Sequence, residues 1–251
     1  MSRIALITGA SSGIGKATAE AFAKSNIDLI LCGRRRERLR ELSEALGPYV
    51  KTTTLEFDVR DRTGTFKAID SLPSEWRNID ILVNNAGNAH GFGPVDEGDP
   101  EDWDAMLDSN VKGLLYLTKA VTPGMVQRGR GHIVNISSIA GKQTYANGTV
   151  YCASKAAVEA LSEGMRLDLT QHGIKVTNIA PGAVETEFSM VRFKGDEARA
   201  DKVYEGFVPL RAEDIADSIA YAVNAPAHVM IADITILAAA QAAATTVYRK
   251  S

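Results

Sequence analysis

Short apolar runs and longer stretches of helical periodicity alternate seven times along this chain. The predicted strands cover Arg3–Thr8, Asp28–Cys32, Lys51–Phe57, Ile79–Val83, His132–Ile136, Lys175–Ile179 and Ile231–Leu237. The helical stretches between them include Ile14–Lys24, Arg35–Leu46, Pro100–Arg128, Val150–Gln171 and Ala212–Ala225. Near-continuous hydrophobicity is typical of strands that are buried on both faces of a sheet. The alternation therefore predicts an α/β fold in which about seven parallel strands carry helices on both faces.

The sequence shows no internal boundary. No stretch rich in proline, glycine and serine divides the chain, so residues 1–251 are predicted to form a single domain. A content of 45% apolar and 24% charged residues is that of an ordinary globular protein. A domain of this length buries roughly 70–75% of its unfolded surface, so it needs neither disulfides nor metal ions for stability.

Charge and cysteine content limit the partners and the compartment. A net charge of −3 disfavours nucleic acids and anionic membranes, because both select a basic footprint. The two cysteines indicate a reducing compartment, and the four dispersed histidines predict no metal site. The first residues lack a signal peptide's features, and the longest apolar stretch, residues 229–240, is too short to cross a bilayer. We therefore expect a cytoplasmic protein.

A glycine-rich loop joins the first predicted strand to the first helix. It reads Thr8-Gly9-Ala10-Ser11-Ser12-Gly13-Ile14-Gly15. A helix start offers unpaired N–H groups and a positive dipole end, and glycine permits close backbone approach, so the loop suits a pyrophosphate. The predicted cofactor contacts here are Gly9, Ser11, Ser12, Gly13, Ile14 and Gly15. The spacing is G-x-x-x-G-x-G, and a tight turn without a ligand is the alternative. Its place in the first strand–helix unit favours a doubly wound, Rossmann-type dinucleotide fold.

The end of the second strand indicates which dinucleotide is bound. A site for NAD would place an acidic side chain here, but the sequence continues with Arg34 and Arg35. A guanidinium can hold the 2′-phosphate of NADP through two hydrogen bonds, so both arginines are candidate NADP ligands. A solvated basic helix start is the alternative reading. Glu37 is close enough in sequence to weaken the local positive potential.

Tyr151 and Lys155 are four residues apart on a predicted helix, so their side chains share one face. A phenol with a pKa of about 10 is a poor base at neutral pH, whereas a neighbouring ammonium lowers that pKa. The pair could then exchange a proton with an alcohol or carbonyl oxygen. A half-buried tyrosine with a lysine alongside is the alternative.

Two further polar residues are candidates for the same site. Ser138 follows the strand His132–Ile136, and ligands of parallel sheets bind beyond the carboxyl ends of strands. It could hydrogen-bond a substrate oxygen, or it could simply cap or turn the chain. Asn110 lies inside a helical stretch, where asparagine has poor propensity. It could bind a water in a proton path, or it could be an exposed polar residue.

These motifs occur in an order that resembles the short-chain dehydrogenase/reductase family. The resemblance covers almost the whole chain and rests on the glycine loop, Asn84-Asn85-Ala86-Gly87, Asn110, Ser138, Tyr151-x3-Lys155 and Pro181-Gly182. It implies that Tyr151 donates and accepts the proton, and that Lys155 tunes its pKa and binds the nicotinamide ribose. It also implies that Ser138 stabilises the substrate oxygen and that Asn110 holds a relay water.

The family resemblance implies further cofactor contacts and an assembly. Asp58 and Val59 match the adenine-contacting position, and Asn85 and Ala86 match the contact with the adenine ribose. The nicotinamide side corresponds to Pro181, Gly182, Val184 and Thr186. A turn is the alternative reading of residues 84–87. A homotetramer built partly from residues 100–128 and 150–171 is also implied.

The region after residue 184 indicates a substrate class. Residues 187–196 and 226–229 resemble the NADP-dependent 3-hydroxy acid dehydrogenase branch, whose members oxidise the β-hydroxyl of serine, allo-threonine or 3-hydroxypropionate. Residues 184–210 form a long connection after a strand end, which is a common place for a substrate loop. Arg192 within it could neutralise a substrate carboxylate, whereas Lys194 is as well explained by solvation.

Two alternative functions remain. The nearest is a broad-specificity carbonyl or ketoacyl reductase, which differs in the Arg192 segment. The other is a non-enzymatic protein that senses NADPH. Such a protein would have no need of Ser138, Tyr151 and Lys155 together.

Overall fold

The computed structural model describes residues 2–250. Its seven strands form one parallel sheet in the order β3-β2-β1-β4-β5-β6-β7. The strands are β1 (Ile4–Thr8), β2 (Asp28–Gly33), β3 (Thr52–Glu56), β4 (Ile81–Asn84), β5 (Gly131–Ile136), β6 (Ile174–Pro181) and β7 (Asp233–Ile236). The strand order reverses between β1 and β4, and such a reversal opens a crevice at the carboxyl ends of the two strands. The predicted doubly wound sheet is confirmed.

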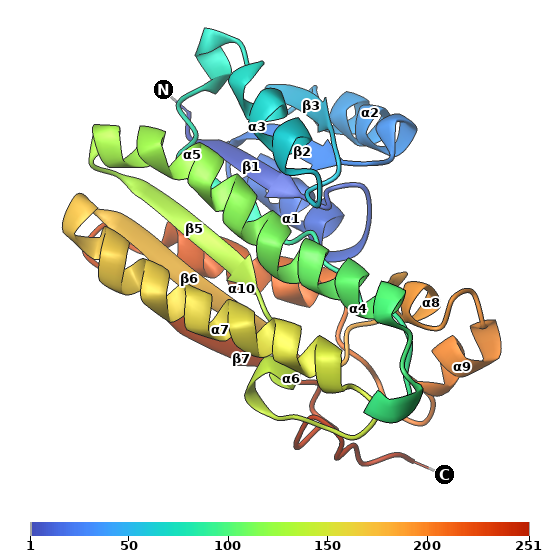
Figure 1. Cartoon of the computed structure of the whole chain (residues 1–251). Coiled ribbons are helices and arrows are strands. Elements are labelled where there is room, and N and C mark those ends of the chain that lie inside the picture. The colour runs from blue at the N-terminus through green and yellow to red at the C-terminus, as the bar shows by residue number, and fades with distance from the viewer. Residues whose placement is uncertain (1, 251) are drawn as a thin grey trace.

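Helices cover both faces of the sheet (Figure 1). They are α1 (Gly13–Lys24), α2 (Arg36–Leu46), α3 (Arg62–Asp70), α4 (Pro100–Leu107), α5 (Leu114–Arg128), α6 (Ile139–Lys142), α7 (Thr149–Leu169), α8 (Phe188–Arg192), α9 (Glu197–Lys202) and α10 (Ala212–Asn224). Helices α1, α2 and α10 supply Phe22, Leu39 and Ile219 to one core. Helices α3, α5 and α7 supply Ile69, Leu117 and Val158 to the other.

Side-chain alternation along the inner strands explains the two cores. Leu6 of β1 packs into the core under α5 and α7, whereas its neighbour Ile7 packs under α1 and α10. Both side chains are fully buried, as the sequence predicted. The outer strands differ, since β3 and β7 contain half-buried and exposed residues. Burial on both faces is therefore wrong for these two strands, which lie at the edges of the sheet and contain threonine and acidic side chains beside their apolar residues.

The predicted helix Pro100–Arg128 is interrupted. A π-helical turn at Asp108–Gly113 separates α4 from α5. Asn110 lies in this turn, buried, with its side chain hydrogen-bonded to the main chain of Asn88. Single π turns within helices are frequent at functional sites. The wider turn therefore presents an asparagine to a neighbouring loop at the edge of the crevice.

The connection at residues 184–210 contains two short helices, α8 and α9, which stand beyond the sheet in Figure 1. The end of the chain packs against this connection, since the Lys250 amide donates to Gly206 at 2.7 Å and Arg249 Nη2 donates to Val203 at 3.0 Å. The tail thus contacts its own chain. Among the described residues, no helix is both long enough and apolar enough to span a membrane.

Candidate active site

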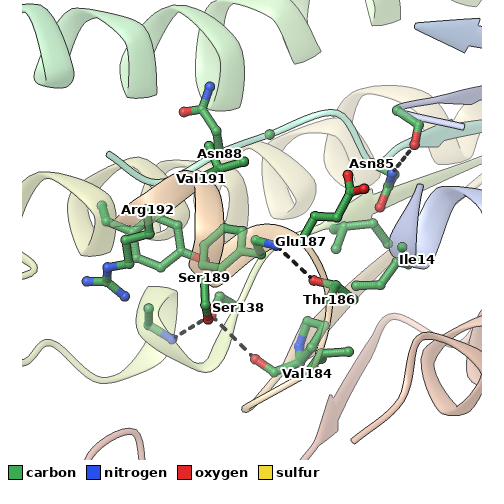
Figure 2. Close-up of a pocket in the computed structure, with 18 of the residues that line it drawn as sticks. Ile14, Asn85, Asn88, Ser138, Val184, Thr186, Glu187, Ser189, Val191 and Arg192 are labelled. Carbon is green, nitrogen blue, oxygen red and sulfur yellow. Dashed lines mark hydrogen bonds between the residues drawn. The ribbon is translucent and has the colours of Figure 1, made fainter. Parts of the chain in front are cut away.

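A cleft of about 790 Å³ opens at the carboxyl ends of the strands. Figure 2 shows side chains from distant parts of the chain around it, including Ile14, Asn85, Ser138 and Arg192. The predicted site residues that line it are Gly9, Ser11, Ser12, Gly13, Ile14, Arg34, Arg35, Asp58, Val59, Asn85, Ala86, Ser138, Tyr151, Lys155, Pro181, Gly182, Val184, Thr186 and Arg192. Two predicted residues, Gly15 and Asn110, do not line the cleft themselves but lie next to residues that do. The fold therefore gathers the candidates into one site.

The start of α1 allows a ligand to come close to its backbone and favours a negatively charged one. Its first turn contains no acidic residue, and its N-cap residue Ser12 makes no side-chain capping bond, whereas α4 has an aspartate cap. Gly9 and Gly13 have φ of +65° and +50°, which favour glycine. A Cβ at Gly15 would lie 2.3 Å from the Gly9 carbonyl oxygen. The uncapped amides and absent side chains fit a pyrophosphate, so this part of the cleft fits a dinucleotide.

Arg35 bridges the glycine loop and the substrate-loop segment. Its Nε and Nη2 donate to Ser11 Oγ and Ser12 Oγ at 3.0 and 2.5 Å. Its Nη1 donates to Glu187 Oε2 at 2.8 Å, and Arg38 donates to the other oxygen at 2.7 Å. The two arginines lower the pKa of Glu187 to about 2. The sequence suggested Glu37 as the local counter-charge, but Glu37 pairs with Arg40.

Arg34 lies farther from its acidic neighbour than Arg35 does. Arg34 Nη1 lies 3.8 Å from Asp58 Oδ2, and Asp58 also pairs with Arg60 at 2.7 Å. The Asn85 side chain donates to the Thr8 carbonyl at 2.9 Å, and the Ala86 amide donates to Thr8 Oγ1 at 2.9 Å. Asn85 and Ala86 thus brace the loop after β1, while Asn85, Ala86 and Gly87 also line the cleft; the structure assigns no turn to residues 85–87.

Tyr151 and Lys155 lie together on α7, and both are buried. Lys155 Nζ donates to the Ile136 carbonyl at 3.0 Å and stands 6.0 Å from the centroid of the Tyr151 ring. Burial raises the pKa of Tyr151 and lowers the pKa of Lys155 to about 8. The predicted direction for the pKa of Tyr151 is therefore wrong in this structure, because desolvation of the phenol outweighs the lowering by Ser138 and Arg192. A phenol that keeps its proton suits proton donation.

Ser138 contacts Tyr151, and Asn110 contacts the helix that carries Tyr151 and Lys155. Ser138 Oγ accepts from the Ala140 amide at 3.1 Å, which caps α6, and donates to the Pro181 carbonyl at 3.4 Å. Its contact with Tyr151 lowers the pKa of that phenol, against the larger effect of burial. Asn110 Nδ2 donates to Ser154 Oγ at 3.0 Å, which ties the π turn to α7. Ser138 thus combines a structural cap with a place beside the phenol.

Of the two cations considered in the substrate loop, Arg192 faces the cleft and Lys194 does not. Lys194 pairs with Asp102 at 3.0 Å and with Asp99 at 3.8 Å. The Arg192 guanidinium carbon lies 5.4 Å from the centroid of the Tyr151 ring. Its Nε and Nη2 are buried and have no hydrogen-bond partner among residues 2–250. A buried guanidinium with free donors beside the phenol is a ready site for an anion.

The architecture of this cleft agrees with comparisons to known proteins. Residues 3–197 match the family described as short chain dehydrogenase. The chain belongs to the short chain dehydrogenase family. This confirms the resemblance drawn from the glycine loop, Ser138, Tyr151 and Lys155.

Two similar proteins and one solved structure match nearly the full length of this chain. The NADP-dependent 3-hydroxy acid dehydrogenase of Salmonella typhi is 47% identical over 239 residues, which are 95% of this chain and 96% of that protein. The serine 3-dehydrogenase of Rhizobium radiobacter is 42% identical over 252 residues, covering 100% of both chains. The solved closed form of a serine dehydrogenase complexed with NADP+ has a TM-score of 0.92 and 44% identity, covering 99% of this chain and 100% of that one.

The sequence did not identify several residues in and around this cleft. Tyr145 and Phe92 lie against Arg192, and Glu187 binds Arg35 and Arg38. Each of these residues is far in sequence from the residue it contacts, so no local motif indicates the contact. Tyr145 and Arg192, for instance, are 47 residues apart in sequence. The described residues contain no cluster of three or more His, Cys, Asp or Glu side chains that could hold a metal ion.

Proposed function

We propose that this protein transfers a hydride between NADP(H) and a small 3-hydroxy acid, such as serine, allo-threonine or 3-hydroxypropionate, at the β-hydroxyl. The observation that carries the proposal is the Arg192 guanidinium. Its carbon lies 5.4 Å from the centroid of the Tyr151 ring, and its buried Nε and Nη2 have no hydrogen-bond partner among residues 2–250. The names of the two relatives, a 3-hydroxy acid dehydrogenase and a serine 3-dehydrogenase, support the same substrate class.

NADP is the cofactor that the cleft fits best. The uncapped first turn of α1 and the glycines Gly9 and Gly13 in the cleft wall suit the pyrophosphate, and Arg34 and Arg35 would hold the 2′-phosphate. Asp58, Val59, Asn85 and Ala86 would contact the adenosine, and Pro181, Gly182, Val184 and Thr186 the nicotinamide side. When bound, this cofactor supplies or accepts the hydride.

The chain's own residues move the proton and orient the substrate. Tyr151 holds a proton at its Oη, because burial raises its pKa, and gives it to the carbonyl oxygen in the reducing direction. Ser138, beside it, donates to the same oxygen. Lys155 contributes a positive charge next to the phenol, and Asn110 holds a water that relays protons to Lys155. Arg192 binds the carboxylate and thereby positions the reacting carbon of the substrate beside Tyr151.

The protein is proposed to work as a cytoplasmic homotetramer assembled through α4, α5 and α7. Exposed leucines on these helices, Leu107, Leu115 and Leu167, support that choice of surface. Light scattering coupled to gel filtration tests the assembly. A monomeric mass would contradict it.

The function is tested with purified protein at 340 nm, using NADP and NAD with serine, allo-threonine, 3-hydroxyisobutyrate and 3-hydroxypropionate. We expect turnover with NADP and these acids. The Tyr151→Phe variant should lose turnover and keep cofactor binding, whereas Tyr221→Phe, on the exposed face of α10, should behave as wild type. Near-normal turnover of Tyr151→Phe would overturn the role of the phenol.

Two other outcomes would indicate the alternative functions. Efficient reduction of uncharged ketones, with no preference for acids, would indicate a broad carbonyl or ketoacyl reductase. Stoichiometric NADPH binding without any turnover would indicate a sensing protein. The Arg192→Ala variant distinguishes the proposed function from both alternatives. If the proposed function is correct, this variant should lose its preference for acids and still reduce ketones.

A further inference from the structure

Among residues 2–250, the Arg192 guanidinium has one hydrogen-bond partner, and three aromatic rings surround it. Its guanidinium carbon lies 4.8 Å from the ring centroid of Phe92 and 5.6 Å from that of Tyr145, in addition to its contact with Tyr151. Its Nη1 donates to Tyr145 Oη at 3.1 Å. No carboxylate among residues 2–250 lies within 4.0 Å of it. Tyr145 is thus the polar anchor of this cation.

The hydroxyl of Tyr145 has bonding capacity left after this contact. Its oxygen accepts from Arg192, so its own proton is available to a second acceptor, for which the thiol of Cys152 and a bound anion compete. Burial raises the pKa of Tyr145, so the group stays a neutral phenol over the working pH range. Arginine cannot shed its proton, so an anion from outside the chain would compensate the buried charge.

We propose that Tyr145 completes the anion subsite of the substrate by orienting Arg192 and by donating its own proton to the same anionic group. This inference rests on the proposed function and adds a specificity residue to it. Arg192 Nε, Arg192 Nη2 and the Tyr145 hydroxyl then form three donors for the two oxygens of a carboxylate. Such charge-assisted hydrogen bonds in a desolvated site discriminate strongly against a group that lacks the charge.

The backbone next to Tyr145 is shaped to hold its ring. A Cβ at Gly148 would lie 2.2 Å from Cε2 of that ring, so only glycine leaves the tyrosine in this place. On the other side, the ring of Phe92 stands 6.5 Å from the Tyr145 ring, centroid to centroid. The loop between α6 and α7 thereby fixes the hydroxyl at the guanidinium. Tyr145 therefore orients Arg192 as well as donating its proton to the anion.

The test compares an acid with its uncharged amide on the same carbon skeleton. We would measure kcat and KM of wild type and Tyr145→Phe with 3-hydroxypropionate and 3-hydroxypropionamide, using NADP. The variant keeps the ring and loses one oxygen. We expect KM for the acid to rise about tenfold or more, with kcat and the amide reaction changed less than about twofold. Tyr221→Phe is the control and should leave both reactions unchanged.

A second variant moves the ring without removing the hydroxyl. Gly148→Ala should also lower the preference for acid over amide, because its methyl displaces Tyr145 from Arg192. An unchanged KM for the acid in Tyr145→Phe, or an equal loss for acid and amide, would overturn the role of Tyr145 while leaving the proposed function intact. If wild type turned over neither 3-hydroxypropionate nor the other hydroxy acids of the assay above, the proposed function and this inference would both fail.

Discussion

Glu187 and Arg35 form an ion pair of 2.8 Å across 152 residues of sequence. The pair joins the segment before α8, which lies beside the substrate subsite, to the arginine that we assign to the 2′-phosphate of NADP. Arg38 binds the second carboxylate oxygen of Glu187. In the proposed complex, this carboxylate would compete with the phosphate for Arg35 and repel it. We therefore expect cofactor binding and the position of residues 184–210 to be linked through the Glu187 side chain.

Replacing the Glu187 carboxylate should tighten binding of the phosphorylated cofactor. We expect Glu187→Gln to lower the Kd for NADPH by roughly three- to tenfold, because it removes a charge repulsion at a partly exposed site. The Kd for NADH should not change. Fluorescence titration of both cofactors measures the ratio. Glu37→Gln is the matched control, since Glu37 pairs with Arg40; an equal effect in both variants would argue against this competition.

Sequence alone was sufficient for the sheet, because each inner strand is specified by its own residues. Leu6 and Ile7 are both apolar, so a strand containing them needs a core on each face, and the structure supplies both. The π turn at Asp108–Gly113 was not predictable in the same way. It contains no proline, and its only glycine is its last residue. The turn is stabilised by bonds from Asn110 to Asn88, which depend on tertiary packing.

The charge on Lys155 should depend on Glu159, one turn further along α7. Burial lowers the pKa of Lys155 to about 8, and the Glu159 carboxylate opposes that shift. Lys155 is cationic below this pH and loses its charge above it, so kcat/KM should decline on the alkaline side. Glu159→Gln should move this decline to lower pH by about one unit.

The pH profile of kcat/KM for Glu159→Gln measures this effect. Glu163→Gln, at an exposed position of the same helix, is its control. Glu159 also accepts hydrogen bonds from Ser137 and Asn178, and a glutamine oxygen can still accept them. A lower rate with an unmoved alkaline limb would indicate a purely structural role for Glu159.

His132 should make the fold sensitive to acid. It is buried in β5, its Nε2 lies 2.8 Å from Thr177 Oγ1, and burial lowers its pKa from 6.5 to about 3. Between these two values the unfolded chain binds a proton that the native protein excludes. The free energy of unfolding therefore falls as the pH drops through this window, by about 2–3 kcal/mol at pH 4.5 from this group.

Urea denaturation at pH 7 and pH 4.5 isolates that contribution. Other acidic groups also titrate, so the informative quantity is the pH-dependent loss of wild type minus that of His132→Gln. We expect the variant to lose about 2–3 kcal/mol less than wild type. His172→Gln, at an exposed position, should lose as much as wild type. Equal losses in all three proteins would mean that His132 accepts a proton without unfolding.

The sequence could group candidate site residues where neighbours in sequence are also neighbours in space. Tyr151 and Lys155 share a helix face, and the glycines of the first loop lie within one turn. Tyr145 was missed because its partner Arg192 reaches it only through the folded substrate loop. The raised pKa of Tyr151 was missed for a related reason, since burial is a property of the assembled cleft.

Gly15 should tolerate no side chain, although its backbone conformation is an ordinary one. Its φ is not among the positive values, so any effect of substitution comes from space alone. A Cβ there would lie 2.3 Å from the Gly9 carbonyl oxygen and 2.6 Å from Asn85 Nδ2. Gly15→Ala must therefore move the loop or α1. We expect a loss of about 1–3 kcal/mol in stability and a NADPH Kd raised at least about tenfold.

Gly164→Ala is the matched control, because it adds the same methyl group to a helix in open space. No heavy atom lies within 4 Å of a Cβ at Gly164 in α7. Alanine has the better helix propensity, so this variant should gain about 1 kcal/mol and bind NADPH as wild type does. Thermal unfolding measures the stability of both variants, and cofactor titration measures their Kd for NADPH. Normal NADPH binding by Gly15→Ala would show that α1 can retreat from Gly9 and that the close approach is not what positions the pyrophosphate.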